Sequence, residues 1–192
     1  DGHRRALAAL KAQHPEGDRG RQVLEQLARH ADEGGDVARA LTYATAAGLE
    51  AMVRGRPQQA IEHLGRALER LRWEEVVASP DERRRQEVTL LTRLSEALAT
   101  VGRYKDAARA LEELLALSPD GVWIRRRLGD LALKQGDAAQ ARRWLQEALA
   151  SAGDGAAQRG ERARVLEVMS RMALCHGDYL QVIALAGESV EI

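Results

Sequence analysis

Apolar residues recur along this chain at the three- and four-residue spacing that marks one face of a helix. In the stretch VTLLTRLSEALATVG, for example, Leu91, Leu94 and Leu98 lie at i, i+3 and i+7 and share one stripe. No stretch shows the sustained alternation of β-branched and polar residues that is typical of a strand. The pattern predicts an all-α protein with helices at about 2–14, 19–33, 36–54, 57–76, 81–101, 104–116, 121–135, 138–150, 156–176 and 179–190.

A short glycine motif recurs between these predicted helices. It reads GDVARA from Gly35, GRPQQA from Gly55, GRYKDA from Gly102, GDAAQA from Gly136 and GDYLQV from Gly177. Each glycine is expected to end one helix in a left-handed backbone conformation, which costs least where no Cβ is present. The residue two places later is expected to pack in the turn; these residues are Val37, Pro57, Tyr104, Ala138 and Tyr179.

Small residues at matching places predict that each motif joins two helices in close contact. Five places after the glycine stand Ala40, Ala60, Ala107 and Ala141, with Val182 as the exception. Gly48 and Gly129 lie inside first helices, where a missing side chain lets crossing helices touch. Ser79 and Asp81 are candidate N-caps for the helix that follows them.

The spacing of two motifs leads to a family. Gly102 and Gly136 are 34 residues apart, and Pro119 closes the unit between them. A Leu-Gly pair in the first helix, an aromatic residue after the turn, an alanine and a final proline resemble the tetratricopeptide repeat. That resemblance implies antiparallel helix pairs stacked into a right-handed superhelix with one concave face.

The same resemblance divides the chain. Residues 1–33 are expected to form helices that lead into the array, and 34–78 one repeat-like helix pair. Residues 79–192 are expected to hold three repeats, at about 88–121, 122–155 and 163–192, the last one truncated.

A second resemblance covers about residues 3–74. HRRALAAL from His3, LARHADEGGDVARALTYATAAG from Leu27 and GRPQQAIEHLGRAL from Gly55 resemble the helical-repeat arms of bacterial multidomain regulators. Those regulators include signal-transduction ATPases, LuxR-type and maltose-regulator-type activators, and some Ser/Thr kinases. The resemblance implies a sensor or scaffold arm of a larger signalling or transcription-regulatory protein.

Charge and composition exclude several partners. The 29 basic and 29 acidic residues give a formal net charge of zero and are mixed along the chain, which argues against direct nucleic-acid binding. No apolar run approaches the length of a membrane span. A single cysteine excludes an intramolecular disulfide and favours a reducing compartment, so we expect a cytoplasmic protein.

No residue pattern predicts catalysis, a cofactor or a metal. The chain has no G-x-x-x-x-G-K-[ST] phosphate loop, and no two of its five histidines lie three or four residues apart. Cys175 and His176 are adjacent, so their side chains diverge on a helix. We interpret them as a buried small residue and a helix-end histidine rather than as a nucleophile and its base.

The repeat resemblance also suggests a binding surface, because the groove of such proteins is lined mainly by first helices. On this chain that implies Thr92, Arg93, Glu96, Trp123, Arg126, Arg127, Asp130, Lys134, Arg164, Glu167 and Arg171. Trp123 beside arginines would suit an acidic or aromatic peptide. The alternative is a core Trp123 among solvated arginines. Thr92 and Glu96 do not match the lysine–asparagine clamp of chaperone-binding repeats, which disfavours a chaperone-tail receptor.

Three functions follow as hypotheses. The first is a non-catalytic arm that binds a protein or peptide partner. The second is an arm that senses a small-molecule inducer, as in the maltose-regulator relatives. The third is a self-association module, in which end helices stack on another copy to give a homodimer.

Overall fold

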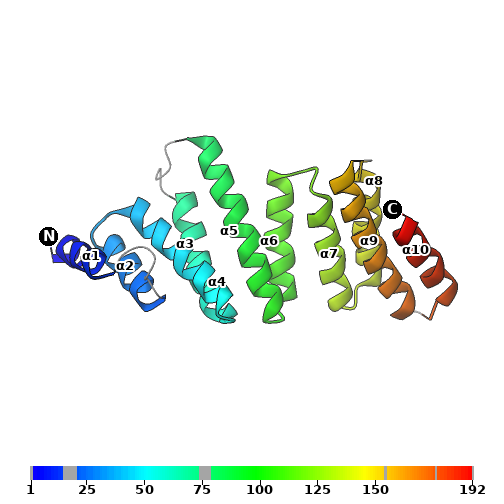
Figure 1. Cartoon of the computed structure of the whole chain (residues 1–192), viewed down its shortest axis with the longest axis horizontal. Coiled ribbons are helices and arrows are strands. Elements are labelled where there is room, and N and C mark those ends of the chain that lie inside the picture. The colour runs from blue at the N-terminus through cyan, green and yellow to red at the C-terminus, as the bar shows by residue number, and fades with distance from the viewer. Residues whose placement is uncertain (1, 15–20, 74–78, 154, 176, 192) are drawn as a thin grey trace. The chain divides into compact units, whose positions relative to one another are not determined.

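The computed structural model describes residues 2–14, 21–73, 79–153, 155–175 and 177–191. These residues fold into helices that follow one another along the chain (Figure 1). Their bounds are α1 (Gly2–Gln13), α2 (Arg21–Glu33), α3 (Val37–Val53), α4 (Pro57–Trp73), α5 (Pro80–Thr100), α6 (Tyr104–Leu117), α7 (Val122–Lys134), α8 (Ala138–Ser151), α9 (Ala156–Cys175) and α10 (Tyr179–Glu191).

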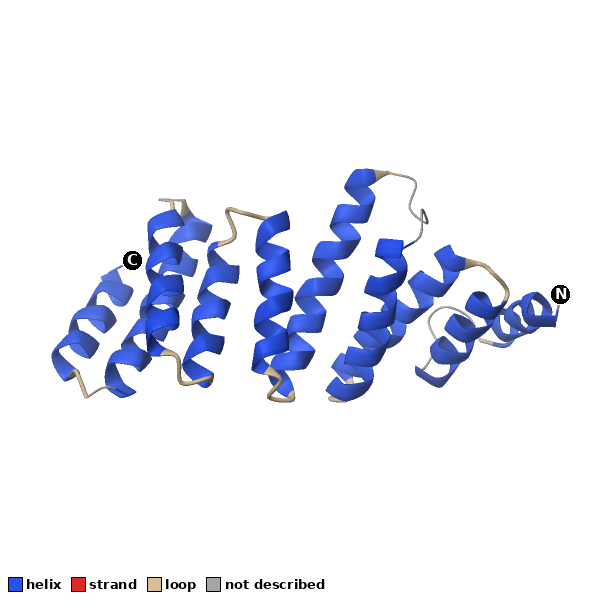
Figure 2. Ribbon diagram, turned by 180° about the vertical axis from the view of Figure 1, so that it is seen from behind, coloured by secondary structure: helices blue, strands red, loops and turns tan. Residues whose placement is uncertain are grey.

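The all-α prediction is confirmed, and every predicted helix is present. Figure 2 shows helices and loops only, and no strand occurs in the described ranges. The described helix ends lie within one or two residues of the predicted ones. The predicted ends at residues 19, 76 and 176 lie outside the described residues.

The five motif glycines adopt the predicted left-handed conformation. Their φ angles are 72° at Gly35, 67° at Gly55, 77° at Gly102, 79° at Gly136 and 74° at Gly177, and no described non-glycine residue has a positive φ. An L side chain rarely adopts this backbone conformation, so glycine at these places ends one helix and turns the chain toward the next.

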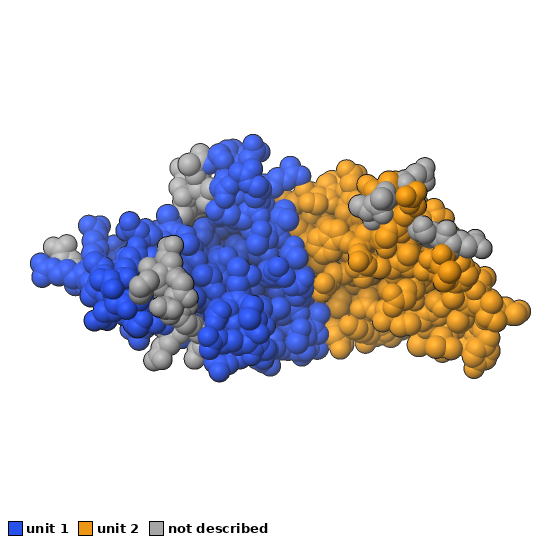
Figure 3. Space-filling model, viewed as in Figure 1, with its two compact units in different colours: residues 1–102 blue, residues 103–192 orange. Residues whose placement is uncertain are grey.

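The chain divides into two compact units, residues 1–102 and 103–192 (Figure 3). In the first unit α3 packs between α2 and α4, and α5 packs on α4. Its core is built largely from alanine and leucine: one cluster holds Leu7, Leu24, Leu27, Ala31, Ala40, Tyr43 and Ala47. A Cβ added to Gly48 would lie 2.6 Å from Cγ of Leu64, so α3 and α4 touch at this glycine as predicted.

In the second unit α7 packs against α6, α8 and α9, and α10 packs on α9. One core cluster joins α7, α8 and α9 through Val122, Leu145, Ala148, Val165, Val168 and Met169. A Cβ at Gly129 would meet Cγ of Leu145 at 2.7 Å, the same close contact as in the first unit. Ala107 and Ala141, the predicted small residues, are fully buried.

Three details differ from the predictions. Tyr179 does not pack in its turn but is 67% exposed, because no described residue covers that face of α10. Cys175 is exposed rather than buried, and His176 lies outside the described residues. Ser79 caps α5 by accepting from the Glu82 N–H at 3.2 Å, whereas Asp81 lies in the first turn.

The repeat boundaries drawn from the sequence stay a prediction. The repeat expected over 88–121 has its first helix in the first unit and its second helix in the second unit.

Candidate functional site

The predicted groove residues lie on α5, α7 and α9. On α5 the Thr92 hydroxyl donates to the Val88 carbonyl at 2.7 Å, and Arg93 pairs with Glu96 at 3.0 Å. This segment of α5 therefore presents a locally neutralised surface.

On the second unit, the predicted residues of α7 and α9 come together in a network of ion pairs. Arg126 of α7 pairs with Glu161 of α9 at 3.1 Å, and Arg171 of α9 pairs with Asp130 of α7 at 2.8 Å. Lys134 also reaches Asp130, at 3.2 Å. We name these residues, with Trp123, Arg127, Arg164 and Glu167, the α7–α9 face.

The pairing changes the chemistry expected of this face. Arg164 also contacts Glu161, so four of its cationic side chains already have carboxylate partners. Trp123 is only partly buried, and the aromatic ring below Lys134 is Tyr104, with its centroid 5.8 Å from the ammonium nitrogen. The α7–α9 face is thus a surface of shared ion pairs between two helices, and its five basic residues outnumber its three carboxylates.

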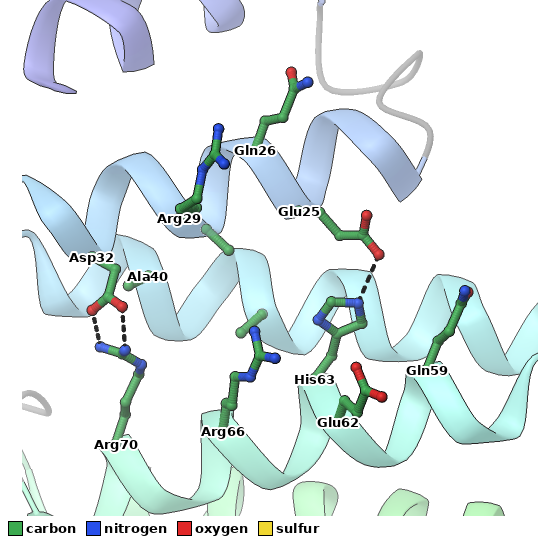
Figure 4. Close-up of a pocket in the computed structure, with 12 residues that line it drawn as sticks. Glu25, Gln26, Arg29, Asp32, Ala40, Gln59, Glu62, His63, Arg66 and Arg70 are labelled. Atoms are coloured by element: carbon green, nitrogen blue, oxygen red, sulfur yellow. Dashed lines mark hydrogen bonds and ion pairs between the residues drawn. The ribbon is translucent and has the colours of Figure 1, made fainter.

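A hollow lies in the first unit between α2 and α4, with α3 as its floor (Figure 4). We call it the α2–α4 groove. It encloses about 590 Å³. Its lining residues are Glu25, Gln26, Ala28, Arg29, Asp32, Ala40, Ala44, Gln59, Glu62, His63, Arg66 and Arg70.

Two interactions bridge the groove from α2 to α4. His63 Nε2 lies 2.9 Å from Glu25 Oε1, and Arg70 pairs with Asp32, as the dashed lines in Figure 4 show. His63 is 9% exposed, so the low dielectric around it strengthens its contact with Glu25. These bridges fix the spacing of the two walls.

Between the bridges stand charges that the fold does not neutralise. Arg66 extends from α4 between the His63 and Arg70 pairs, and Arg29 stands on α2 (Figure 4). Neither arginine, nor Glu62, has an ion-pair partner within the described ranges. Gln59 Oε1 is buried without a donor among the same residues, which is a costly state for a carbonyl oxygen.

The floor of the groove is made of alanines. Ala40 and Ala44 are one helical turn apart on α3, and Ala28 lies on α2. Because their side chains are short, a bound chain can approach the helix backbone closely. The combination of a small apolar floor and polar walls suits an extended peptide.

The repeat pattern did not reveal this groove, because the groove is lined mainly by α2 and α4 rather than by first helices. A usable signal was present in the sequence. Arg66 and Arg70 lie at i and i+4, and so do Ala40 and Ala44, which places charges above small residues once α3 and α4 are paired.

A smaller pocket of about 320 Å³ lies between α3 and α5. Its lining residues are Leu41, Thr42, Thr45, Glu82, Arg85, Gln86, Thr89 and Leu90. Hydrogen bonds from Arg85 and then Gln86, together with the charge of Arg85, lower the pKa of Glu82. The lowered pKa favours the ionised form of Glu82 at this pocket.

The structure also brings together side chains that the sequence separated. His3 of α1 lies beside His30 and Glu33 of α2, a group of potential metal ligands that helical spacing in the sequence did not reveal. The histidines are 27 residues apart in the chain, which is why helical spacing alone did not pair them.

Comparison with known proteins identifies the repeats. The family model described as tetratricopeptide repeat matches residues 98–164. Residues 98–164 are tetratricopeptide repeats. Repeats of this family are scaffolds for protein interactions, and the coarse functional prediction agrees with this match. The search of curated proteins found no matching relative.

Solved structures share the fold across most of the chain. MamA matches with 15% identity and a TM-score of 0.62 over 88% of each chain. MamA from residue 41 to its end, from Desulfovibrio magneticus RS-1, matches with 16% identity and a TM-score of 0.66, over 98% of this chain and 92% of that one. BtubC (BKLC) from P. vanneervenii matches with 16% identity and a TM-score of 0.62, over 100% of this chain and 74% of that one. At such identity the likeness shows the fold alone.

No helix among the described residues is both long enough and apolar enough to cross a bilayer.

Proposed function

We propose that this chain is a non-catalytic interaction arm that binds an extended acidic segment of a partner protein in the α2–α4 groove. The observation that carries the proposal is Arg66, which extends from α4 between the two bridges, together with Arg29 on the α2 wall; neither has a carboxylate partner in the described part of the chain. Arginine binds carboxylates through two parallel hydrogen bonds, which gives both affinity and register.

The other groove residues complete the recognition. The amides of Gln26 and Gln59 can bond a peptide backbone, and an incoming N–H would satisfy the buried Gln59 Oε1. Glu62 would repel an acidic peptide residue placed next to it. The preferred segment therefore carries its carboxylates opposite Arg29 and Arg66. Charge placement, rather than total charge, sets the specificity.

The α7–α9 face is proposed as a second contact surface for a partner. Its ion pairs are partly exposed, so the carboxylates of a partner can replace Asp130 or Glu161 as the groups that pair with Arg171 or Arg126. Trp123 would supply apolar contact area at the edge of these pairs.

The resemblance over residues 3–74 supports a place for this arm in a larger bacterial signalling or transcription-regulatory protein. In such a protein, a partner bound in the groove would change the state of an attached ATPase, kinase or DNA-binding domain. The lone cysteine supports a cytoplasmic location for such an arm.

The test is a peptide-display selection on the 192-residue chain, followed by affinity measurements on two variants. Selected peptides should carry acidic residues and should bind Arg66→Glu at least tenfold more weakly, since a charged hydrogen bond becomes a repulsion. Arg109→Glu is the matched control, because Arg109 is 75% exposed on α6 and is not among the residues that line the groove. An equal loss of peptide affinity in both variants would show that the effect comes from net charge alone. No loss of affinity in either variant would refute the groove assignment.

A small-molecule inducer is the second candidate, favoured by the α3–α5 pocket. Its volume of about 320 Å³ lies at the small end of ligand pockets, and Leu41 and Leu90 give it an apolar wall. A thermal-shift screen of sugars and nucleotides should then find a stabilising compound whose effect is lost in Thr45→Leu. A compound that stabilises this variant equally binds elsewhere.

Self-association is a third candidate, favoured by α10. Leu180 and Ile183 are 83% and 70% exposed on a helix of a fold built by stacking helices. A second copy that stacks on this face would give a homodimer. Light scattering across a concentration series should then show a dimer that Ile183→Asp disrupts, whereas a monomer at every concentration would exclude it.

A further inference from the structure

Three potential metal ligands meet between the first two helices. His3 Nδ1 lies 3.2 Å from His30 Nδ1 and 2.9 Å from Glu33 Oε2. His30 Nδ1 lies 3.7 Å from the same carboxylate oxygen. Three donor atoms from two helices therefore form one small triangle.

The size of this triangle fits a tetrahedral metal. Ligand atoms about 2.0–2.1 Å from a zinc ion are separated from one another by about 3.3 Å when the geometry is tetrahedral. The three separations in the structure, 2.9, 3.2 and 3.7 Å, bracket that value. Two histidines and one glutamate are also a known zinc donor set.

Hydrogen bonding alone accounts poorly for this arrangement. The two Nδ1 atoms lie within hydrogen-bond distance of each other, and such a pair of ring nitrogens can share only one proton. A cation at the centre would accept a lone pair from Nδ1 of each ring and a lone pair from a carboxylate oxygen of Glu33. Each of the three ligand atoms would then be bonded to the cation.

The surroundings leave room for a further ligand and favour a cation. The side chains of His3 and Glu33 are 50% and 44% exposed, so water can occupy a fourth position. His30 and Glu33 lie in the last turn of α2, where the negative end of the helix dipole attracts positive charge.

We propose that His3, His30 and Glu33 bind a Zn²⁺ ion that ties α1 to α2. Imidazole and carboxylate ligands from both helices would make the packing of α1 depend on the metal. The ion would act as a structural clip for the start of the first unit, because each ligand it takes from α1 and α2 resists their separation.

The experiment is a Zn²⁺ titration by calorimetry, with thermal unfolding in parallel, on a chain that carries extra residues before Asp1 and no histidine tag. The added residues matter because a free amine two residues before a histidine binds Cu²⁺ and Ni²⁺ by itself. One equivalent of Zn²⁺ should bind, and Co²⁺ in its place should give the visible absorption of a tetrahedral complex.

Three variants decide the outcome. His3→Gln and Glu33→Gln should each weaken Zn²⁺ binding at least tenfold and lose the metal-induced rise in melting temperature. His14→Gln, which removes a histidine just beyond the end of α1, should bind like the parent chain. Equal binding by all three variants, or no binding by the parent chain, would overturn the proposal. Circular dichroism without metal should be the same for all variants, since the replaced side chains are at the surface.

Discussion

At the scale of single residues, the glycines of this chain do two different jobs. The motif glycines supply a left-handed backbone, as Gly136 does with a φ of 79°. Gly48 and Gly129 are ordinary helical residues whose missing Cβ makes room for Leu64 and Leu145. The sequence predicted both roles, because the first kind recurs before each second helix and the second kind follows or precedes leucine inside a first helix.

Gly129→Ala tests the second role. Alanine improves helix propensity, but its Cβ would lie 2.7 Å from Cγ of Leu145, so we expect a net loss of about 1–3 kcal/mol in the free energy of unfolding. The matched control is Gly160→Ala on α9, where an added Cβ meets nothing within 4 Å. There we expect a gain of up to about 1 kcal/mol. Urea denaturation measures both, and equal stability of the two variants would contradict the close contact.

The next scale is the helix, where aspartate after the motif glycine provides the cap. Asp36 accepts from the Arg39 N–H, Asp137 from the Gln140 N–H and Asp178 from the Gln181 N–H. Where arginine replaces aspartate, as at Arg103, no side-chain cap is present. The repeats thus share a turn but differ in how firmly the second helix begins.

Asp137→Ala should lower the free energy of unfolding by about 1 kcal/mol, because the Gln140 N–H loses its acceptor at 2.9 Å. Arg103→Ala, at the equivalent place before α6, removes no cap and should change it by less than about 0.5 kcal/mol. Thermal unfolding compares them. A larger loss for Arg103→Ala than for Asp137→Ala would show that capping does not govern these turns.

The ion pairs that join α7 to α9 make a second prediction at this scale. A double-mutant cycle of Asp130→Asn and Arg171→Gln should give a coupling of about 0.2–1 kcal/mol, because the pair is partly exposed at 25% and 55%. The coupling should shrink in high salt, since salt screens exposed charges. A coupling of zero in low salt would show that the Asp130–Arg171 pair does not stabilise the packing of α7 on α9.

At the scale of the whole molecule, helix number, helix type and turn positions could be predicted from the sequence, because each follows from local spacing and from residues with restricted backbone preferences. The site could not be predicted in the same way. Arg126 and Glu161 are 35 residues apart, and the His3–His30 pair is separated by 27 residues. Which side chains neutralise one another, and which stay unpaired, depends on helix packing that no local pattern encodes.

The α2–α4 groove shows this most clearly. Glu25, Asp32, His63 and Arg70 look like ordinary surface residues in the sequence, yet they pair across the groove and leave Arg29 and Arg66 without partners in the described structure. The proposed binding function therefore rests on charges that helix packing leaves unpaired among the described residues.

The central claim, that a partner segment lies in the α2–α4 groove, is tested most directly by methyl NMR of the chain labelled at alanine. Titration with an acidic peptide from the display selection should shift the methyl signals of Ala28, Ala40 and Ala44, which line the groove. The signals of Ala132 and Ala141, in the core of the second unit, should stay in place. Shifts confined to alanines of the second unit, with those three unchanged by a bound peptide, would contradict the account.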